Sequence, residues 1–296
     1  MTRFTTQFQP SGILAFTGPD SIKFLQGQTT CNLDDLNDSN ALYGAFCNPK
    51  GRIKSTFLLV QINPEKLLML LQPDQCAYLQ DELKMYIAFF KSEVTDETAN
   101  YQMLGLLHDE AGRKESTYTV TSENDVFRVN LPGEFRRELL ISENTIETDG
   151  FDELDNNDWA IQDIQNGLVW THEGTREKFL PHDINLPGLG GVSYEKGCYT
   201  GQEIVARMHY RGNPKYTSAV LSTEESIDAL ESPLKAELSD GKVKSIGHII
   251  SQSKGAQGKS WILASVHKDL LEQQEIKLSI TEETTILCGI NRTILG

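Results

Sequence analysis

The sequence predicts an α+β protein of two or three domains. Its 296 residues exceed the length of one average domain. Short apolar segments are separated by polar turns, and the first half holds one long helical pattern, which favours an α+β unit over repeated β-α-β units. With 39% hydrophobic and 23% charged residues, the chain has enough apolar material for real cores.

The first half of the chain predicts a meander of strands. A strand is expected at 13–17, followed by a short helix that Asp20 would cap. Strands at 42–47, 53–62 and 66–71 are separated by turns in which proline presets φ and glycine accepts positive φ. A helix should begin at Pro73 and end near Phe90, and further strands are expected at 101–107, 126–130 and 135–141.

The second half begins with an acidic stretch. Residues 143–158 include seven acidic residues and no basic one, which is typical of a solvated connector. A helix is expected from about Asn157 to Gly167, with Trp159 and Ile164 on its buried side. Five short strands at 216–221, 243–251, 261–267, 276–280 and 285–288 then predict a small barrel or sandwich.

Composition and charge exclude several classes of protein. The net charge of −15 is unlike the basic surface that nucleic-acid binding requires. The odd number of cysteines, five, argues against a complete disulfide framework. No two of them have a C-x-x-C spacing, and nothing resembles paired Cys/His ligands, which argues against structural zinc. The N-terminus has no signal-peptide pattern and no apolar run could span a bilayer, so we expect a cytoplasmic protein.

The chemistry is concentrated between Lys196 and Lys215. Gly197 and Gly201 bracket Cys198, and a helix beginning near Thr200–Gln202 would direct its N–H groups toward the thiol. That dipole and the charge of Lys196 would favour the thiolate, although an inert buried cysteine in a glycine-rich bend is the alternative.

Basic residues gather in the same region. The segment 196–215 contains one acidic residue, Glu203, and four basic residues, which are Lys196, Arg207, Arg211 and Lys215. Such an island suits an anionic ligand such as a glutamate tail or a phosphate, while the alternative is an ordinary charged helix face. His182 and His209 flank this region, but the six histidines form no metal-ligand pair, and we expect no metal site.

Residues 196–203 read K-G-C-Y-T-G-Q-E, and this segment resembles the signature K-G-C-[FY]-x-G-Q-E of the folate-binding YgfZ family at every position. The resemblance covers essentially the whole chain. It extends to Pro181, Asn185, 189–191, Arg207, 211–212, Gly18, Asp20, 25–29 and 50–51.

The resemblance implies a fold like that of the folate-dependent T-protein (aminomethyltransferase) of glycine cleavage, with three domains in a ring. Residues 1–52 and 152–215 would form the central folate-binding domain. Residues 53–151 would be an inserted, ferredoxin-like α+β domain, and 216–296 a C-terminal β-barrel.

The resemblance also implies tetrahydrofolate or a derivative as cofactor. Trp159 would stack on the pterin, as tryptophan can. A second family tryptophan is replaced by Ser11 or Gly12, and Gln165 stands where the family has glutamate. The expected folate-binding residues are Trp159, Gln165, Lys196, Tyr199, Gln202, Glu203, Arg207 and Arg211, and Cys198 is the candidate reactive thiol.

The expected function is a folate-binding accessory factor for synthesis or repair of [4Fe–4S] clusters in a subset of enzymes, with an indirect effect on tRNA modification. Its partners would be folate and iron–sulfur client or assembly proteins, without direct nucleic-acid or membrane binding. It would not be a conventional enzyme. The alternative, a tetrahydrofolate-dependent aminomethyl or one-carbon transferase, lacks the T-protein carboxylates, since Ser55 and Thr56 stand at those positions and a hydroxyl is no base at neutral pH.

Overall fold

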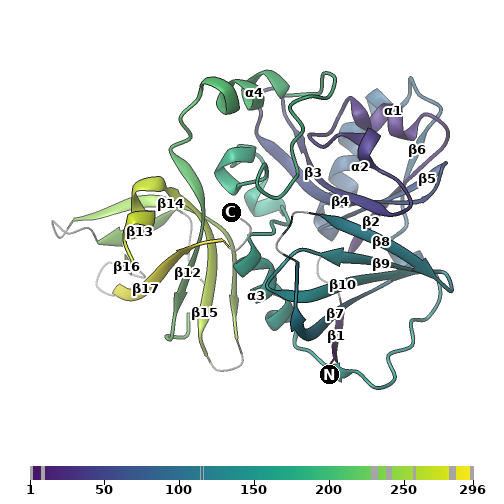
Figure 1. Cartoon of the computed structure of the whole chain (residues 1–296). Helices are drawn as coiled ribbons and strands as arrows, with labels where there is room; N and C mark the ends of the chain where they lie inside the picture. The colour runs from purple at the N-terminus through teal and green to yellow at the C-terminus, as the bar shows by residue number, and fades with distance from the viewer. Residues whose placement is uncertain are drawn as a thin grey trace.

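The computed structural model describes residues 3–7, 11–113, 115, 117–227, 233–237, 242–255, 258–279 and 285–293. Figure 1 shows a long, twisted sheet with flanking helices beside a separate closed sheet at the C-terminal end of the chain. The α+β class predicted from the sequence is confirmed by this arrangement.

Eleven strands of the described residues form the long sheet. Their order is β11 (Asp152–Glu153), β1 (Arg3–Gln7), β7 (Gln102–Ala111), β10 (Phe135–Ser142), β9 (Val126–Leu131), β8 (Tyr118–Glu123), β3 (Asn40–Cys47), β4 (Ile53–Asn63), β5 (Lys66–Leu71), β2 (Gly12–Thr17) and β6 (Glu93–Asp96). All neighbours are antiparallel except β11 and β1. The two halves of the sheet meet between β3 and β8, where pairing is limited to Asn40 with Thr119 and Ala41 with Tyr118.

Helices cover one face of the β2–β6 half. They are α1 (Ser21–Gln26) and α2 (Pro73–Ile87), with the short 3₁₀ helix η1 (Leu33–Asp35). The 3₁₀ helix η2 (Thr98–Asn100) has no buried residue, and its Thr98 hydroxyl accepts a hydrogen bond from the backbone N–H of Ile13 in β2 (3.0 Å). The other three helices pack on the sheet. Their apolar side chains share a buried cluster with strand residues, including Phe24, Phe57 and Leu79. Burial of such large side chains, each stabilising by about 1.5–3 kcal/mol, holds the helices on the sheet.

Two helix ends differ from the sequence prediction. Asp20 precedes α1, but its side chain makes no cap and instead accepts a hydrogen bond from the backbone N–H of Lys91 (2.9 Å). Helix α2 ends at Ile87 rather than near Phe90, because Phe90 turns inward and packs against Phe24 with ring centroids 5.3 Å apart. In both cases a contact distant in sequence overrides the local pattern.

Six strands of the described residues close into a barrel. Their order is β12 (Tyr216–Thr223), β15 (Ser260–His267), β14 (Val243–Lys254), β13 (Leu234–Glu237), β16 (Glu275–Ser279) and β17 (Thr285–Arg292), with the 3₁₀ helix η5 (Lys268–Glu272) after β15. The five predicted strands are all present, although residue 280 of one prediction lies outside the described residues. The short strand β13 was not predicted.

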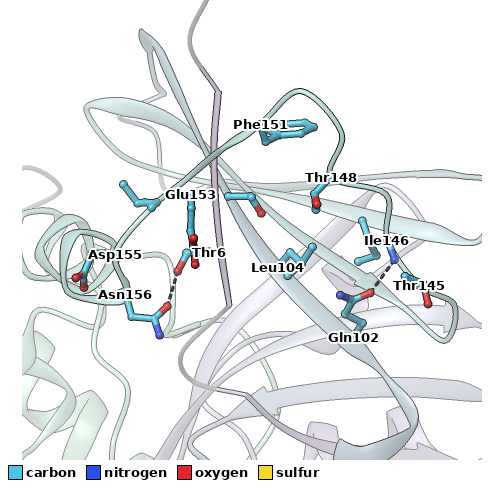
Figure 2. A pocket seen from close by; sticks show the side chains of 12 residues that line it. Thr6, Gln102, Leu104, Thr145, Ile146, Thr148, Phe151, Glu153, Asp155 and Asn156 are labelled. Carbon is cyan, nitrogen blue, oxygen red and sulfur yellow. Dashed lines mark hydrogen bonds between the residues drawn. The ribbon is translucent and has the colours of Figure 1, made fainter.

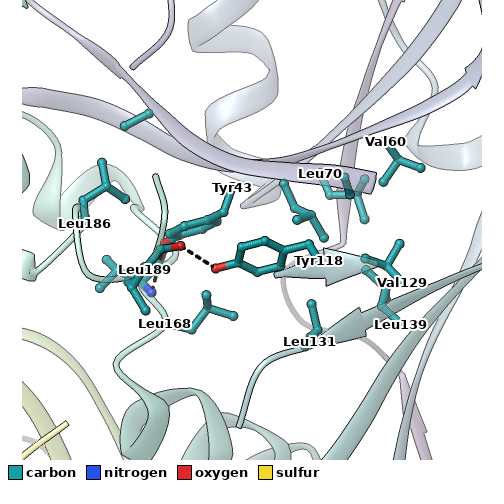
Figure 3. Packing of buried hydrophobic residues seen from close by; sticks show 14 of the residues in the cluster. Tyr43, Val60, Leu70, Tyr118, Val129, Leu131, Leu139, Leu168, Leu186 and Leu189 are labelled. Carbon is teal, nitrogen blue, oxygen red and sulfur yellow. Dashed lines mark hydrogen bonds between the residues drawn. The ribbon is translucent and has the colours of Figure 1, made fainter. Parts of the chain in front are cut away.

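Helix α3 (Asn156–Asn166) packs on β14 and β15 of the barrel and on β1 of the long sheet. Gly167 ends it in the left-handed region (φ 76°), as the sequence predicted for this helix end. Beyond it, Tyr43, Tyr118, Leu168 and Leu189 belong to the largest buried cluster, whose packing Figure 3 shows. The predicted domain boundary after residue 52 lies between β3 and β4, and these two strands pair with each other, so the sheet is continuous across it. The three-domain division and the ring arrangement stay predictions.

Candidate functional site

The signature segment (residues 196–203) is a loop that leads into α4 (Gln202–Arg211), visible at the top of Figure 1. The helix therefore begins where the sequence predicted. Gly201 precedes it with φ +86°, and a Cβ on Gly201 would lie 2.5 Å from the carbonyl oxygen of Asn48. Gly51 has φ +72°, and its Cβ would lie 3.0 Å from Cβ of Ile204. Two glycines distant in sequence thus let the loop and the turn at 48–51 come into direct contact.

Lys196 ties the same loop to the N-terminal part of the chain. Its buried ammonium donates hydrogen bonds to the carbonyl oxygens of Thr29 (2.8 Å) and Cys31 (2.6 Å) and lies 5.3 Å from the ring centroid of Tyr199. Burial lowers the pKa of Lys196 to about 8, so the group remains a cationic donor at neutral pH. The structure therefore gives Lys196 a positioning role, because its ammonium is bonded to the backbone.

Cys198 is exposed, whereas Cys31, Cys47, Cys76 and Cys288, which complete the five cysteines of the chain, are buried. Burial raises the pKa of Cys31 to about 11 and that of Cys47 to about 12, which disfavours their thiolates. Cys198 and Gly197 line a cavity of about 420 Å³ together with Lys23 and Gln26 of α1 and Asp34 of η1. Of the two alternatives left open by the sequence, the buried bend is thus wrong, while activation of the thiol stays a prediction.

The other predicted residues of this region have different environments. Tyr199 is 7% exposed and packs inward, and burial raises its pKa. Gln202 is half-buried in the first turn of α4, and Glu203 is exposed. Arg207 and Arg211 are exposed on the same helix, so the basic island is at the surface, with Lys196 excluded from it by burial.

Trp159 and Gln165 lie on α3, apart from α4 (Figure 1). Trp159 is 1% exposed, and its ring lies against Gly105, where a Cβ would come within 2.7 Å of ring carbon Cζ3. The Arg137 guanidinium also lies over the Trp159 ring, 5.2 Å from the ring centroid. Gln165 is half-buried and accepts a hydrogen bond from Gln162 (3.4 Å). The structure therefore separates these two residues from the signature segment and places the Trp159 ring in a packed interior.

Ser55 and Thr56 are fully buried in β4. The Thr56 hydroxyl donates to the carbonyl oxygen of Val169 (2.6 Å) and accepts from the N–H of Thr171 (2.9 Å). Tyr43 also bonds to the backbone of Val169. These hydroxyls hold the segment after α3 against the sheet.

A stack of aromatic rings lies beside α4, and only two of its members, His182 and His209, were named from the sequence. The ring of His209 stacks on that of Tyr194 at 3.8 Å and 15°, and Tyr210, 67% exposed, meets His209 edge-on at 4.8 Å. His182, on the 3₁₀ helix η4 (Pro181–Ile184), is 3.2 Å from the Tyr194 hydroxyl. The sequence predicted only that His182 and His209 flank the signature segment. That both contact Tyr194 is seen only in the folded structure.

No group of three or more His, Cys, Asp or Glu residues that could hold an ion exists among the described residues. No described helix is long and apolar enough to cross a membrane.

The structure is similar to the glycine cleavage system aminomethyltransferase T from Bartonella henselae, with a TM-score of 0.72 and 12% identity over 100% of this chain and 86% of that chain. The likeness defines the fold, which is the α+β fold of the aminomethyltransferase T-protein. No protein-family model matches the sequence.

Sequence comparison identifies the family within this fold. The chain is 30% identical over 242 residues to the tRNA-modifying protein YgfZ of Colwellia psychrerythraea, covering 76% of this chain and 72% of that protein. It is 28% identical over 301 residues to the protein of the same name from Hamiltonella defensa, covering 93% and 87%. The chain belongs to the YgfZ family, which confirms the resemblance of its signature segment.

Replacing Gly201 should destabilise the protein. In Gly201→Ala, positive φ and the contact with the Asn48 carbonyl should together cost about 2–4 kcal/mol in the free energy of unfolding, measured by urea titration. Gly197→Ala is the matched control, because a Cβ there meets nothing within 4 Å. Equal stability of the two variants would contradict the proposed contact.

Acid should weaken the packing around His182. Burial, with added repulsion from His209 and Lys268, lowers the pKa of His182 from 6.5 to about 4. Between these values the unfolded chain binds a proton that the folded chain does not, so stability falls as the pH falls. Wild type should lose about 1 kcal/mol more than His182→Gln between pH 7 and pH 4.5, a figure reduced for partial exposure. Parallel urea titrations at both pH values measure this, and the same loss in both proteins would contradict it.

Proposed function

We propose that this protein is an accessory factor for the synthesis or repair of [4Fe–4S] clusters in client enzymes, and that Cys198 is its working thiol. The observation that carries the proposal is the contrast between one exposed cysteine, held on a loop anchored at both ends, and four buried ones. Thiolates are the ligands of iron–sulfur clusters, and an accessible thiol is the one able to meet a partner.

The number of accessible thiols constrains the mode of action. A [4Fe–4S] cluster is held by four cysteine thiolates, and this chain exposes one. Cys198 would therefore be a transient ligand or a redox-active thiol, with the remaining ligands supplied by the client or assembly protein. Relatives named tRNA-modifying protein fit an indirect effect, in which the clients include enzymes that modify tRNA.

Folate binding is part of the proposal, supported by the T-protein fold. The residues of α3 do not fit a pterin stacked directly on Trp159, because that ring is 1% exposed. Arg207 and Arg211, exposed on α4, suit the carboxylates of a folate glutamate tail. Buried Ser55 and Thr56, with Thr56 bonded to the backbone, weigh against carboxylate-assisted one-carbon transfer at that position.

Substitution of the exposed cysteine should abolish cluster maintenance. Cys198→Ser should slow recovery of a damaged [4Fe–4S] client enzyme at least tenfold, because a hydroxyl remains protonated where a thiolate would ligate iron. Cluster absorbance and client activity are followed with purified components, and thermal unfolding verifies the fold. Cys76→Ser, at a buried cysteine, is the control and should retain activity. Full activity of Cys198→Ser would remove this residue from the mechanism.

Folate should bind through α4 rather than through the Trp159 ring. Calorimetric titration of tetrahydrofolate should show binding weakened about tenfold for each of the two arginines removed in Arg207→Gln/Arg211→Gln, since one lost charged hydrogen bond typically costs that much. Trp159→Phe should bind within about twofold of wild type because an inaccessible ring makes no ligand contact. Loss of binding in a folded Trp159→Phe variant would show instead that folate reaches α3.

A further inference from the structure

The outer face of the long sheet carries a cavity that the proposed function does not use. Side chains along a strand alternate between the two faces of the sheet. Gly105 of β7 faces Trp159, so Leu106 and His108 of the same strand point to the other face. On that other side lies a cavity of about 750 Å³ formed over β7, β8, β9 and β10. Figure 1 shows these strands well below α4, so the cavity is separate from the signature segment.

Arginines dominate this cavity, which we call the arginine pocket. Its lining includes Arg113, Arg128, Arg136 and Arg137, with Glu138 as the acid among them. The Arg137 guanidinium is directed to the opposite face, against Trp159 and paired with Asp163 at 2.6 Å. Arg136 is paired with Glu138 at 2.9 Å. Within the described part of the chain, Arg113 and Arg128 form no ion pair, so the pocket keeps two uncompensated positive charges on a protein of net charge −15.

A buried polar network forms the floor of the arginine pocket. Both carboxylate oxygens of Glu138 are engaged: one is 3.0 Å from Nε2 of His108, and the other accepts from Nη2 of Arg136. His108 and Glu138 are each 6% exposed. Burial opposes ionisation of Glu138, but the hydrogen bonds from Arg136 and His108 outweigh it and lower its pKa. A buried carboxylate with both oxygens bonded fixes the orientation of the Arg136 side chain.

The neighbouring cavity, drawn in Figure 2, has the opposite electrostatic character. It has a volume of about 700 Å³, and its described lining includes Glu153 and Asp155, several threonines and no basic residue. Phe151 lines both cavities. The acidic stretch 143–158, predicted to be a solvated connector, thus contributes Phe151 and buried Ile146 to the outer face of the sheet. The acidic side chains of this stretch are nevertheless exposed, apart from partly buried Asp158, so the solvated character predicted for them is confirmed.

We propose that the arginine pocket binds a small ligand carrying two or more phosphate or carboxylate groups. Guanidinium groups pair bidentately with both kinds of anion, and the hydroxyls of Thr117 and Thr121 in the lining can donate further hydrogen bonds. The volume is within the usual range of small-molecule sites. Phe151 and Leu106 offer apolar contact for a ligand's non-ionic part.

The test uses the full-length protein and two probes, pyrophosphate and citrate, in isothermal titration calorimetry at low salt. At least one probe should bind the wild type saturably. Arg113→Gln/Arg128→Gln should weaken that binding about tenfold or more for each arginine removed. Both residues are at least partly exposed, so the variant should fold, which circular dichroism verifies.

Lys244→Gln/Lys268→Gln is the matched control, because it changes the net charge equally at two exposed lysines of the barrel that do not line the arginine pocket. It should bind the probe as the wild type does. Equal weakening in both double variants, loss in the control alone, or no saturable binding by either probe would overturn the proposal. Pyrophosphate binding alone would identify a phosphate ligand, and citrate binding alone a carboxylate. The outcome is independent of folate binding and of Cys198.

Discussion

The placement of Cys198 depends on how the signature segment is anchored. Two interactions fix it: Gly201 packs against the backbone of the turn at Asn48, and the Lys196 ammonium bonds to the Thr29 and Cys31 carbonyls. Each joins residues more than a hundred positions apart. Because a buried ammonium is costly unless it is hydrogen-bonded, Lys196 favours the single arrangement in which both carbonyls are met. The thiol between these anchors remains at the surface.

The same anchoring separates the chain's cysteines into two chemical classes. Buried cysteines behave as small apolar side chains, and their raised pKa values keep them as thiols. Cys198 can be approached by another molecule, and Lys23 and Asp34 give its cavity charged walls. An exposed thiol on a fixed loop fits a protein that acts on a partner, whereas a resident cluster would need several such thiols together.

Some features of the site followed from local sequence. The beginning of α4 was predicted because two glycines and a helix-compatible run define it, and the end of α3 because Gly167 accepts a left-handed conformation. The buried side of α3 was also correct, with Trp159 and Ile164 in the interior. Burial of Trp159 followed from helical periodicity, whereas its assignment to a pterin came from the family resemblance of this helix and stays a prediction.

Other features depended on contacts that no local pattern reveals. Asp20 bonds to Lys91 instead of capping α1, β13 is too short to predict, and the arginines of the outer sheet face come from separate strands and a loop. Lys196 was grouped by sequence with the basic residues around Cys198, yet tertiary packing buries it and bonds its ammonium to the carbonyl oxygens of Thr29 and Cys31.

The sequence by itself determined the α+β class, most strand positions and the family, because these follow from side-chain periodicity, turn chemistry and a specific motif. Only the tertiary structure decided which thiol is exposed, that Lys196 is buried, and which arginines form no ion pair within the described part of the chain. Burial and charge compensation depend on groups brought together from distant parts of the chain.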